Sequence, residues 1–173
     1  MKKKIIAAFL TAAMTIGSLS GVTVFAADAG TDENVEMADA SDVDGTTITF
    51  WHSMGGVNGE AIDTLVKKFN DENEYGITVD AQYQGEYDDS LNKLKSAQIG
   101  NMGADLVQVY EIGTRFMIDS EWIVPMQQMV DADNYDVSEI EPNLAAYYTI
   151  DNELYSMPFN SSTPIMYYNK DMF

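Results

Sequence analysis

The sequence predicts an α/β domain built on a parallel sheet, and two features support that prediction. Short β-branched or aromatic runs alternate with longer segments whose apolar residues recur at helical spacing, in the order strand, helix, strand, helix, strand. Glycine or asparagine follows each helical segment as a stop signal. Such alternation favours parallel strands joined by right-handed crossovers, with helices covering the sheet.

The first strand is predicted at 46–50, where the run Thr-Thr-Ile-Thr-Phe is β-branched and aromatic. A glycine-rich loop separates it from a helix. That helix is predicted because its apolar residues fall at i, i+3, i+4 and i+7, namely Ile62, Leu65, Val66 and Phe69. Asn73 and Gly76 supply the stop, so the helix should end before the second strand begins.

The second strand is expected at 77–83, where apolar and polar residues alternate. A second helix is expected at 86–99, since Leu91 and Leu94 lie one turn apart and Gly100 follows. The segment 105–110 predicts a third strand, short and apolar enough to be central in the sheet.

The rest of the chain predicts a less regular arrangement. Short helices are expected near 113–118 and 142–148, and a turn-rich acidic stretch is expected at 131–136. Two more strands are expected at 153–158 and 164–169. We find no internal repeat in the sequence.

The N-terminus has the layout of a secretory signal peptide. Three lysines follow Met1, an uncharged and largely apolar stretch comes next, and Val24-Phe25-Ala26 resembles a cleavage site, so we expect residues 1–26 to be removed. A membrane-spanning helix is the alternative, but serines, threonines and glycines dilute the stretch. Because the sequence contains no cysteine, we expect a periplasmic or extracellular protein with no lipid anchor through cysteine.

The segment 27–45 is acidic and carries no lysine, arginine or aromatic residue. Such a composition predicts a disordered leader, which would place the folded domain at 46–173. The formal net charge of the whole chain is −19, and a surface of that sign repels nucleic acid and anionic lipid. The acidic run also lacks the spacing of a calcium loop, so no metal site is expected there.

In a parallel sheet, ligands bind beyond the carboxyl ends of the strands, and three predicted loops occupy that position. They contain Trp51 and His52, then Tyr87, then Glu111. The Glu111 carboxylate could accept hydrogen bonds from ligand hydroxyls, or it could simply favour the start of a helix. His52 is the only histidine, which makes a metal site improbable and a structural role the commoner alternative.

A fourth polar segment, 159–164, carries Asn160, Ser161 and Ser162, whose amide and hydroxyls can bind phosphate or sugar oxygens without a formal charge. A catalytic set is harder to find. One histidine without a Gly-x-Ser-x-Gly elbow gives no triad, and a glycoside hydrolase that used Glu111 would lack its second carboxylate. We therefore expect a binding protein rather than an enzyme, with a secreted adhesion module as a further alternative.

Five short motifs stand out between about residue 47 and residue 173. They are 50–54 (Phe-Trp-His-Ser-Met), Tyr87, 108–114 (Gln-Val-Tyr-Glu-Ile-Gly-Thr), 158–164 (Pro-Phe-Asn-Ser-Ser-Thr-Pro) and 167–171 (Tyr-Tyr-Asn-Lys-Asp). Together they resemble one known family, the sn-glycerol-3-phosphate-binding proteins of ABC importers, which are extracellular solute-binding proteins.

The resemblance implies a periplasmic-binding-protein-like fold with two lobes that close on a ligand, of which this chain is the N-terminal lobe and the second lobe is missing. It implies ligand contacts at Tyr87, Glu111 and Ser162, with Trp51, His52 and Ser161 lining the same wall. Any arginine for a phosphate would lie in the second lobe, since Arg115 reads as a surface helix residue.

The function implied is capture of sn-glycerol-3-phosphate or a glycerophosphodiester for an ABC importer. The expected partners are this small polar ligand and the membrane permease subunits, the expected state is a monomer, and no cofactor is expected. An oligosaccharide-binding protein of a carbohydrate importer is the alternative, because Trp51, Tyr83 and Tyr87 could also stack on sugar rings.

Overall fold

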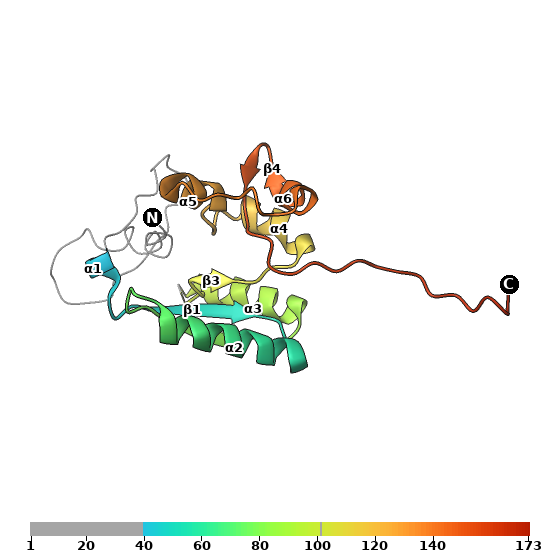
Figure 1. Cartoon of the computed structure of the whole chain (residues 1–173), viewed down its shortest axis with the longest axis horizontal. Coiled ribbons are helices and arrows are strands. Elements are labelled where there is room, and N and C mark those ends of the chain that lie inside the picture. Colours follow the sequence, from blue (N-terminus) through green and yellow to red (C-terminus); the bar gives the residue numbers. More distant parts are fainter. Residues whose placement is uncertain (1–39, 101) are drawn as a thin grey trace.

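The computed structural model describes residues 40–100 and 102–173 (Figure 1). The predicted signal peptide at 1–26 and the leader from 27 to 39 lie outside the described residues.

The core of the domain is a parallel three-stranded sheet in the order β2-β1-β3. Its strands are β1 (Thr47–His52), β2 (Thr78–Tyr83) and β3 (Leu106–Val107). Both neighbours of β1 run parallel to it, which confirms the predicted βαβαβ alternation. The third strand was expected to be central, but among the described residues β1 is the central strand and β3 is an edge. Leu106 and Val107 pair with β1 on one side of β3 and with no described strand on the other. One more backbone hydrogen bond, from the Gln108 N–H to the Trp51 carbonyl at 2.8 Å, continues this pairing.

Two long helices cover the sheet, α2 (Gly56–Glu72) and α3 (Tyr87–Ile99), close to where the sequence predicts them. Phe69 of α2 packs against the face of the sheet that carries Ile48 and Val79. Side chains alternate between the faces of a strand, so Val107 and its register partner Trp51 face the other way. Leu94 of α3 lines a tight space with Val107, which means that α3 covers that second face (Figure 1).

The folded region starts before Thr46, the boundary that the sequence predicts. A short helix, α1 (Ala40–Val43), precedes β1, and the Val43 side chain is 0% exposed. Val43 forms a buried cluster with Ile48 and Ile77, so the end of the expected leader contributes to the core. The acidic composition of 27–45 concealed this contact because a single apolar side chain, Val43, makes it.

The second half of the described chain forms a separate group of short elements on one side of the sheet (Figure 1). These are α4 (Glu111–Asp119), α5 (Met126–Asp133), α6 (Pro142–Tyr147), β4 (Thr149–Ile150) and β5 (Glu153–Leu154). The strands β4 and β5 pair as an antiparallel hairpin. Asp151 and Asn152 form its two-residue turn with φ values of 54° and 68°, which is the left-handed backbone that such turns need.

Two expectations for this half are corrected. The helix α5 covers the first three residues of the stretch expected as turns, because Met129 and Val130 are buried and Asn134, at φ 52°, ends the helix in the left-handed conformation. The strand expected at 164–169 does not form; these residues are exposed and the chain runs away from the body (Figure 1). A β-prone sequence needs a neighbouring strand to pair with, and the described part of the chain supplies none beside it.

No helix in the described ranges is both long enough and apolar enough to cross a membrane.

Candidate functional site

The parallel sheet brings the expected site loops to one edge. Because β1, β2 and β3 run in the same direction, their carboxyl ends lie together, and the chain passes from there into α2, α3 and α4. Tyr87 is the first residue of α3, and Glu111 is the first residue of α4. The topology therefore places both predicted ligand contacts at the carboxyl edge, where open α/β sheets bind ligands.

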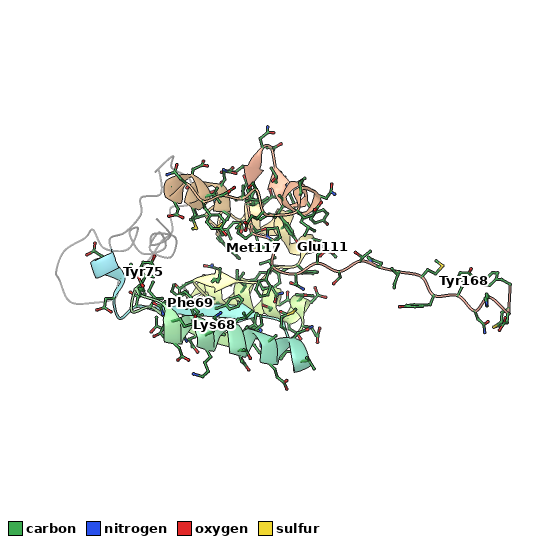
Figure 2. The ribbon with its side chains drawn as sticks, viewed as in Figure 1. Lys68, Phe69, Tyr75, Glu111, Met117 and Tyr168 are labelled. Carbon is green, nitrogen blue, oxygen red and sulfur yellow. The ribbon has the colours of Figure 1, made fainter. Side chains whose placement is uncertain are left out.

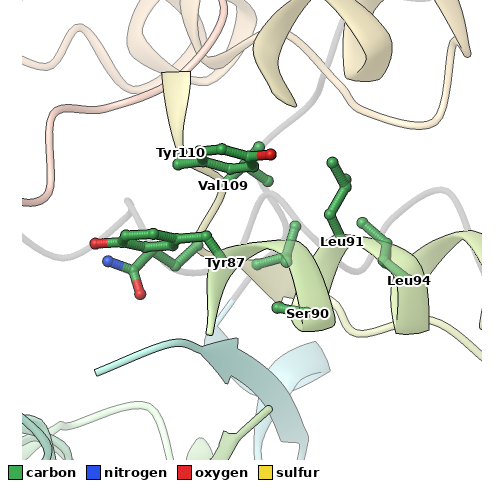
Figure 3. Close-up of a pocket in the computed structure, with 8 residues that line it drawn as sticks. Tyr87, Ser90, Leu91, Leu94, Val109 and Tyr110 are labelled. Atoms are coloured by element: carbon green, nitrogen blue, oxygen red, sulfur yellow. The ribbon is translucent and has the colours of Figure 1, made fainter. Parts of the chain in front are cut away.

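Tyr87 stacks on Tyr110, the residue that precedes α4 (Figure 3). The ring centroids are 5.5 Å apart and the ring planes differ by 9°. The Tyr110 hydroxyl donates a hydrogen bond to the Asp88 carboxylate, and this bond is the main reason why the pKa of Tyr110 is raised. The Tyr110 hydroxyl proton is therefore used in the hydrogen bond to Asp88, and the Tyr110 ring packs against the Tyr87 ring.

A small space lies between α3 and β3 behind the two tyrosines (Figure 3). Leu91 and Leu94 line it together with Val107 and Val109, and it has no room for a water molecule. Ser90, which also lines it, has a buried hydroxyl with no hydrogen-bond partner in the described part of the chain. This space is therefore a packing gap beneath the site and not a ligand cavity.

Glu111 is exposed at the end of α4 nearer to the sheet (Figure 2). A carboxylate in the first turn interacts favourably with the helix dipole, so its position at the helix start is itself stabilising. Burial raises the pKa of Tyr148, and the charge of Glu111 raises it further, which places this phenol within electrostatic reach of the carboxylate. Tyr148 follows α6, a helix to which the sequence had assigned no part in the site.

His52 lies inside the protein behind the carboxyl edge. Its side chain is 3% exposed and lies beside the rings of Phe50 and Tyr83. The Nδ1 atom accepts a hydrogen bond from the Met54 N–H at 3.3 Å. Burial lowers the pKa of His52, against a smaller opposing effect of Asp63, so the ring is neutral and holds the loop after β1 in place.

Trp51 is half-buried on the opposite face of β1. Its Nε1–H donates to the Gln82 side-chain oxygen at 3.1 Å, across the register pair that joins β1 and β2. The Trp51 Nε1–H and the His52 Nδ1 thus each have a hydrogen-bond partner within the protein. Each supports the edge of the sheet from within.

Ser161 and Ser162 are both exposed. They follow two residues that hold the segment against the sheet. The Phe159 ring meets the Phe50 ring edge to face at 6.0 Å, and the Asn160 side chain bonds to Gln108. Phe159 and Asn160 are thus held against the sheet, and the two exposed serines follow them directly along the chain.

Asn160, which the sequence indicates as a polar candidate, is bonded to Gln108, which the sequence does not assign to the site. The Gln108 side-chain oxygen accepts from the buried Ser53 N–H at 2.9 Å, and its nitrogen donates to the Asn160 oxygen at 2.8 Å. The Asn160 nitrogen in turn lies 3.4 Å from the Tyr87 hydroxyl. Both residues stand in motifs that carry the family resemblance, which was the available signal.

Within residues 40–100 and 102–173, no cluster of three or more His, Cys, Asp or Glu side chains could hold a metal ion. Arg115 forms an exposed ion pair with Asp119 at 2.8 Å on α4, which confirms that it is a surface helix residue. The predicted contacts are thus neutral hydroxyls and the exposed Glu111 carboxylate, and the exposed Asp88 carboxylate lies beside them in its bond to Tyr110.

A family model for bacterial extracellular solute-binding proteins matches residues 64–173. The chain belongs to this family. Curated relatives carry a more specific name, sn-glycerol-3-phosphate-binding periplasmic protein UgpB. The relative from Salmonella paratyphi A is 44% identical over 134 residues, which are 74% of this chain and 30% of the relative. The relative from Escherichia coli K12 is 41% identical over 134 residues, again 74% of this chain and 30% of the relative.

This member of the solute-binding family therefore spans about a third of the length of the curated relatives it matches. Among solved structures, the sugar-binding protein MalE from Xanthomonas citri is similar with a TM-score of 0.56 and 24% identity, over 65% of this chain and 28% of that one. At that identity the likeness concerns the fold alone. It confirms the periplasmic-binding-protein-like α/β fold and the partial coverage of such a fold by this chain.

Proposed function

We propose that this chain is the N-terminal lobe of an exported solute-binding protein that captures sn-glycerol-3-phosphate, or a glycerophosphodiester, for an ABC importer. The observation that carries the proposal is the 41–44% identity to relatives named for binding sn-glycerol-3-phosphate. The identity extends over about three quarters of this chain, the part that contains the carboxyl edge of the sheet.

The chemistry of the site fits this ligand class. Glu111 is an exposed acceptor suited to the glycerol hydroxyls, and Tyr87 offers a hydroxyl suited to phosphate or glycerol oxygens. Ser161 and Ser162 are exposed next to Asn160, where a ligand held between two closed lobes could reach their hydroxyls. Trp51 and His52 line the same wall, where the Trp51 Nε1–H bonds to Gln82 and the His52 Nδ1 accepts from the Met54 N–H.

The proposal includes the partners and the location of the protein. It is exported after removal of residues 1–26, works as a monomer, and delivers its ligand unchanged to membrane permease subunits. No reaction is assigned to it, because the relatives that it matches are named as binding proteins.

Calorimetry with the protein at its full natural length tests the proposal. We expect glycerol-3-phosphate or glycerophosphocholine to bind and maltose to fail, and each binder to be recovered intact. Glu111→Ala should weaken binding about tenfold to a hundredfold, because a hydrogen bond to a charged group contributes about 1.5–3 kcal/mol. The exposed Glu139 provides a matched control, and Glu139→Ala should leave the affinity unchanged.

Binding of maltose in place of both phosphate compounds would overturn the proposal in favour of the oligosaccharide alternative. Equal losses in Glu111→Ala and Glu139→Ala would instead remove Glu111 from the site, since the loss of affinity would then not depend on which carboxylate is removed.

A further inference from the structure

The direction of each hydrogen bond in the Ser53–Gln108–Asn160–Tyr87 connection follows from its first member. The Ser53 N–H belongs to the backbone and can only donate, and it lies 2.9 Å from the Gln108 side-chain oxygen. Ser53 is 7% exposed and Gln108 is 8% exposed, so water cannot readily replace this bond. The Gln108 amide is therefore fixed with its oxygen toward Ser53 and its nitrogen toward Asn160.

The orientation of the Asn160 side-chain amide follows from that of Gln108. The Gln108 nitrogen can only donate, so the Asn160 atom that lies 2.8 Å away must be its oxygen. This leaves the Asn160 nitrogen, also only a donor, 3.4 Å from the Tyr87 hydroxyl. The Tyr87 oxygen therefore accepts from Asn160, and its own proton is left free for another partner.

The neighbouring tyrosine shows the opposite arrangement. Tyr110 stacks on Tyr87, but its proton is used in the bond to Asp88. Of these two stacked phenols, only Tyr87 keeps a proton that it can offer to a ligand.

We propose that Gln108 and Asn160 are positioning residues that hold the Tyr87 hydroxyl as a hydrogen-bond donor, and that this polarity selects a ligand group which can only accept, such as a phosphate oxygen. This inference rests on the proposed function and deepens it. An ionised phosphate offers acceptor oxygens alone, whereas a sugar hydroxyl can donate or accept and would tolerate either polarity of Tyr87.

Gln108→Glu tests the polarity with almost no change of shape. One carboxylate oxygen still accepts from the Ser53 N–H, but the other cannot donate to Asn160. The Asn160 side-chain amide must then rotate by half a turn, so that its nitrogen donates to the new carboxylate and its oxygen faces Tyr87. The Tyr87 hydroxyl then donates its proton to this oxygen. We expect the affinity for sn-glycerol-3-phosphate to fall about tenfold to a hundredfold, because Tyr87 then points lone pairs at the phosphate.

Asn160→Asp gives the same reversal at an exposed residue and carries the test if the buried Gln108→Glu protein does not fold. Asn160→Ala removes the restraint without reversing it, so only a few-fold loss is expected. Both acidic substitutions also add a negative charge, and a Tyr87→Phe background separates that effect. Repulsion of the phosphate acts in both backgrounds, whereas loss of the Tyr87 proton can matter only where Tyr87 is present.

The expected result is therefore a large loss in each acidic variant of the parent protein and a much smaller loss, a few-fold at most, in Tyr87→Phe. Equal losses in the two backgrounds would overturn the inference while leaving the proposed function intact. Failure of the parent protein to bind sn-glycerol-3-phosphate would instead overturn both the proposed function and this inference.

Discussion

Replacing Asn73 with alanine should destabilise the protein, because this half-buried side chain makes several hydrogen bonds at the end of α2. The Asn73 nitrogen donates to the Phe69 carbonyl and to the Ile77 carbonyl, both at 2.9 Å. Its oxygen accepts from the Tyr75 N–H at 3.2 Å and from the Ile77 N–H at 3.1 Å. One side chain thus ties the end of the helix to the start of β2.

The expected loss follows from these four bonds. Each contributes about 0.5–1.5 kcal/mol net, and water can reach part of a half-buried site, so we expect Asn73→Ala to lower the free energy of unfolding by about 2–3 kcal/mol. For a chain of this size that loss corresponds to a Tm lower by about 5–10 °C. Urea denaturation should show a lower midpoint with an unchanged m-value, since the surface exposed on unfolding is nearly the same.

Asn92, exposed on α3, provides the matched control for the same chemical change. Asn92→Ala should alter stability by less than about 0.5 kcal/mol, since it is a surface position in a helix. If the two variants proved equally stable, the Asn73 side chain would not hold α2 to β2, and the bonds in the structure would be replaced by water at no cost.

Two further predictions concern the packing of α4 and the single histidine. A Cβ on Gly113 would lie 2.6 Å from the Val109 side chain, so Gly113→Ala should destabilise by about 1 kcal/mol or more despite its better helix propensity, and adding Val109→Ala should recover part of that loss in the double mutant. Burial lowers the pKa of His52 below 6.5, so below that pH the unfolded chain takes up a proton that the folded one does not, and stability should fall as the pH drops. Denaturation of the wild type and His52→Asn between about pH 7 and 5.5 checks this, because the slope should be shallower without the histidine.

The first half of the fold could be predicted from the sequence because local signals there agree with the tertiary structure. The apolar face of α2, the alternation in β2 and the stop signals at Asn73 and Gly76 all describe elements that form. Gly76 adopts a φ of 69°, a conformation that glycine reaches without strain. Several independent signals for one element make its prediction reliable.

The later elements were harder to predict because tertiary contacts determine them. The helix α5 is only eight residues long. Two signals indicate it, namely Pro125 at its start and the buried pair Met129 and Val130, but the acidic residues that follow favoured a prediction of turns. The strand expected at 164–169 shows the reverse case. Its β-branched and aromatic composition is genuine, but a strand exists only where a neighbour accepts and donates its ladder bonds, and composition does not reveal the neighbour.

Tertiary contacts also limit what the sequence predicts about the site. The sequence predicts where a side chain lies better than it predicts whether that side chain donates or accepts a hydrogen bond. Placing Tyr87 and Glu111 at the carboxyl edge needs only the order of the elements and the rule that parallel strands end together. Whether Tyr87 offers a proton or a lone pair depends on Gln108, which lies 55 residues from Ser53 and 52 from Asn160. A glutamine can present either end of its amide to either neighbour, and only contact with a backbone N–H removes that freedom. Sequence can therefore indicate which side chains reach a ligand, while the polarity with which they meet it is decided by contacts that exist only in the folded chain.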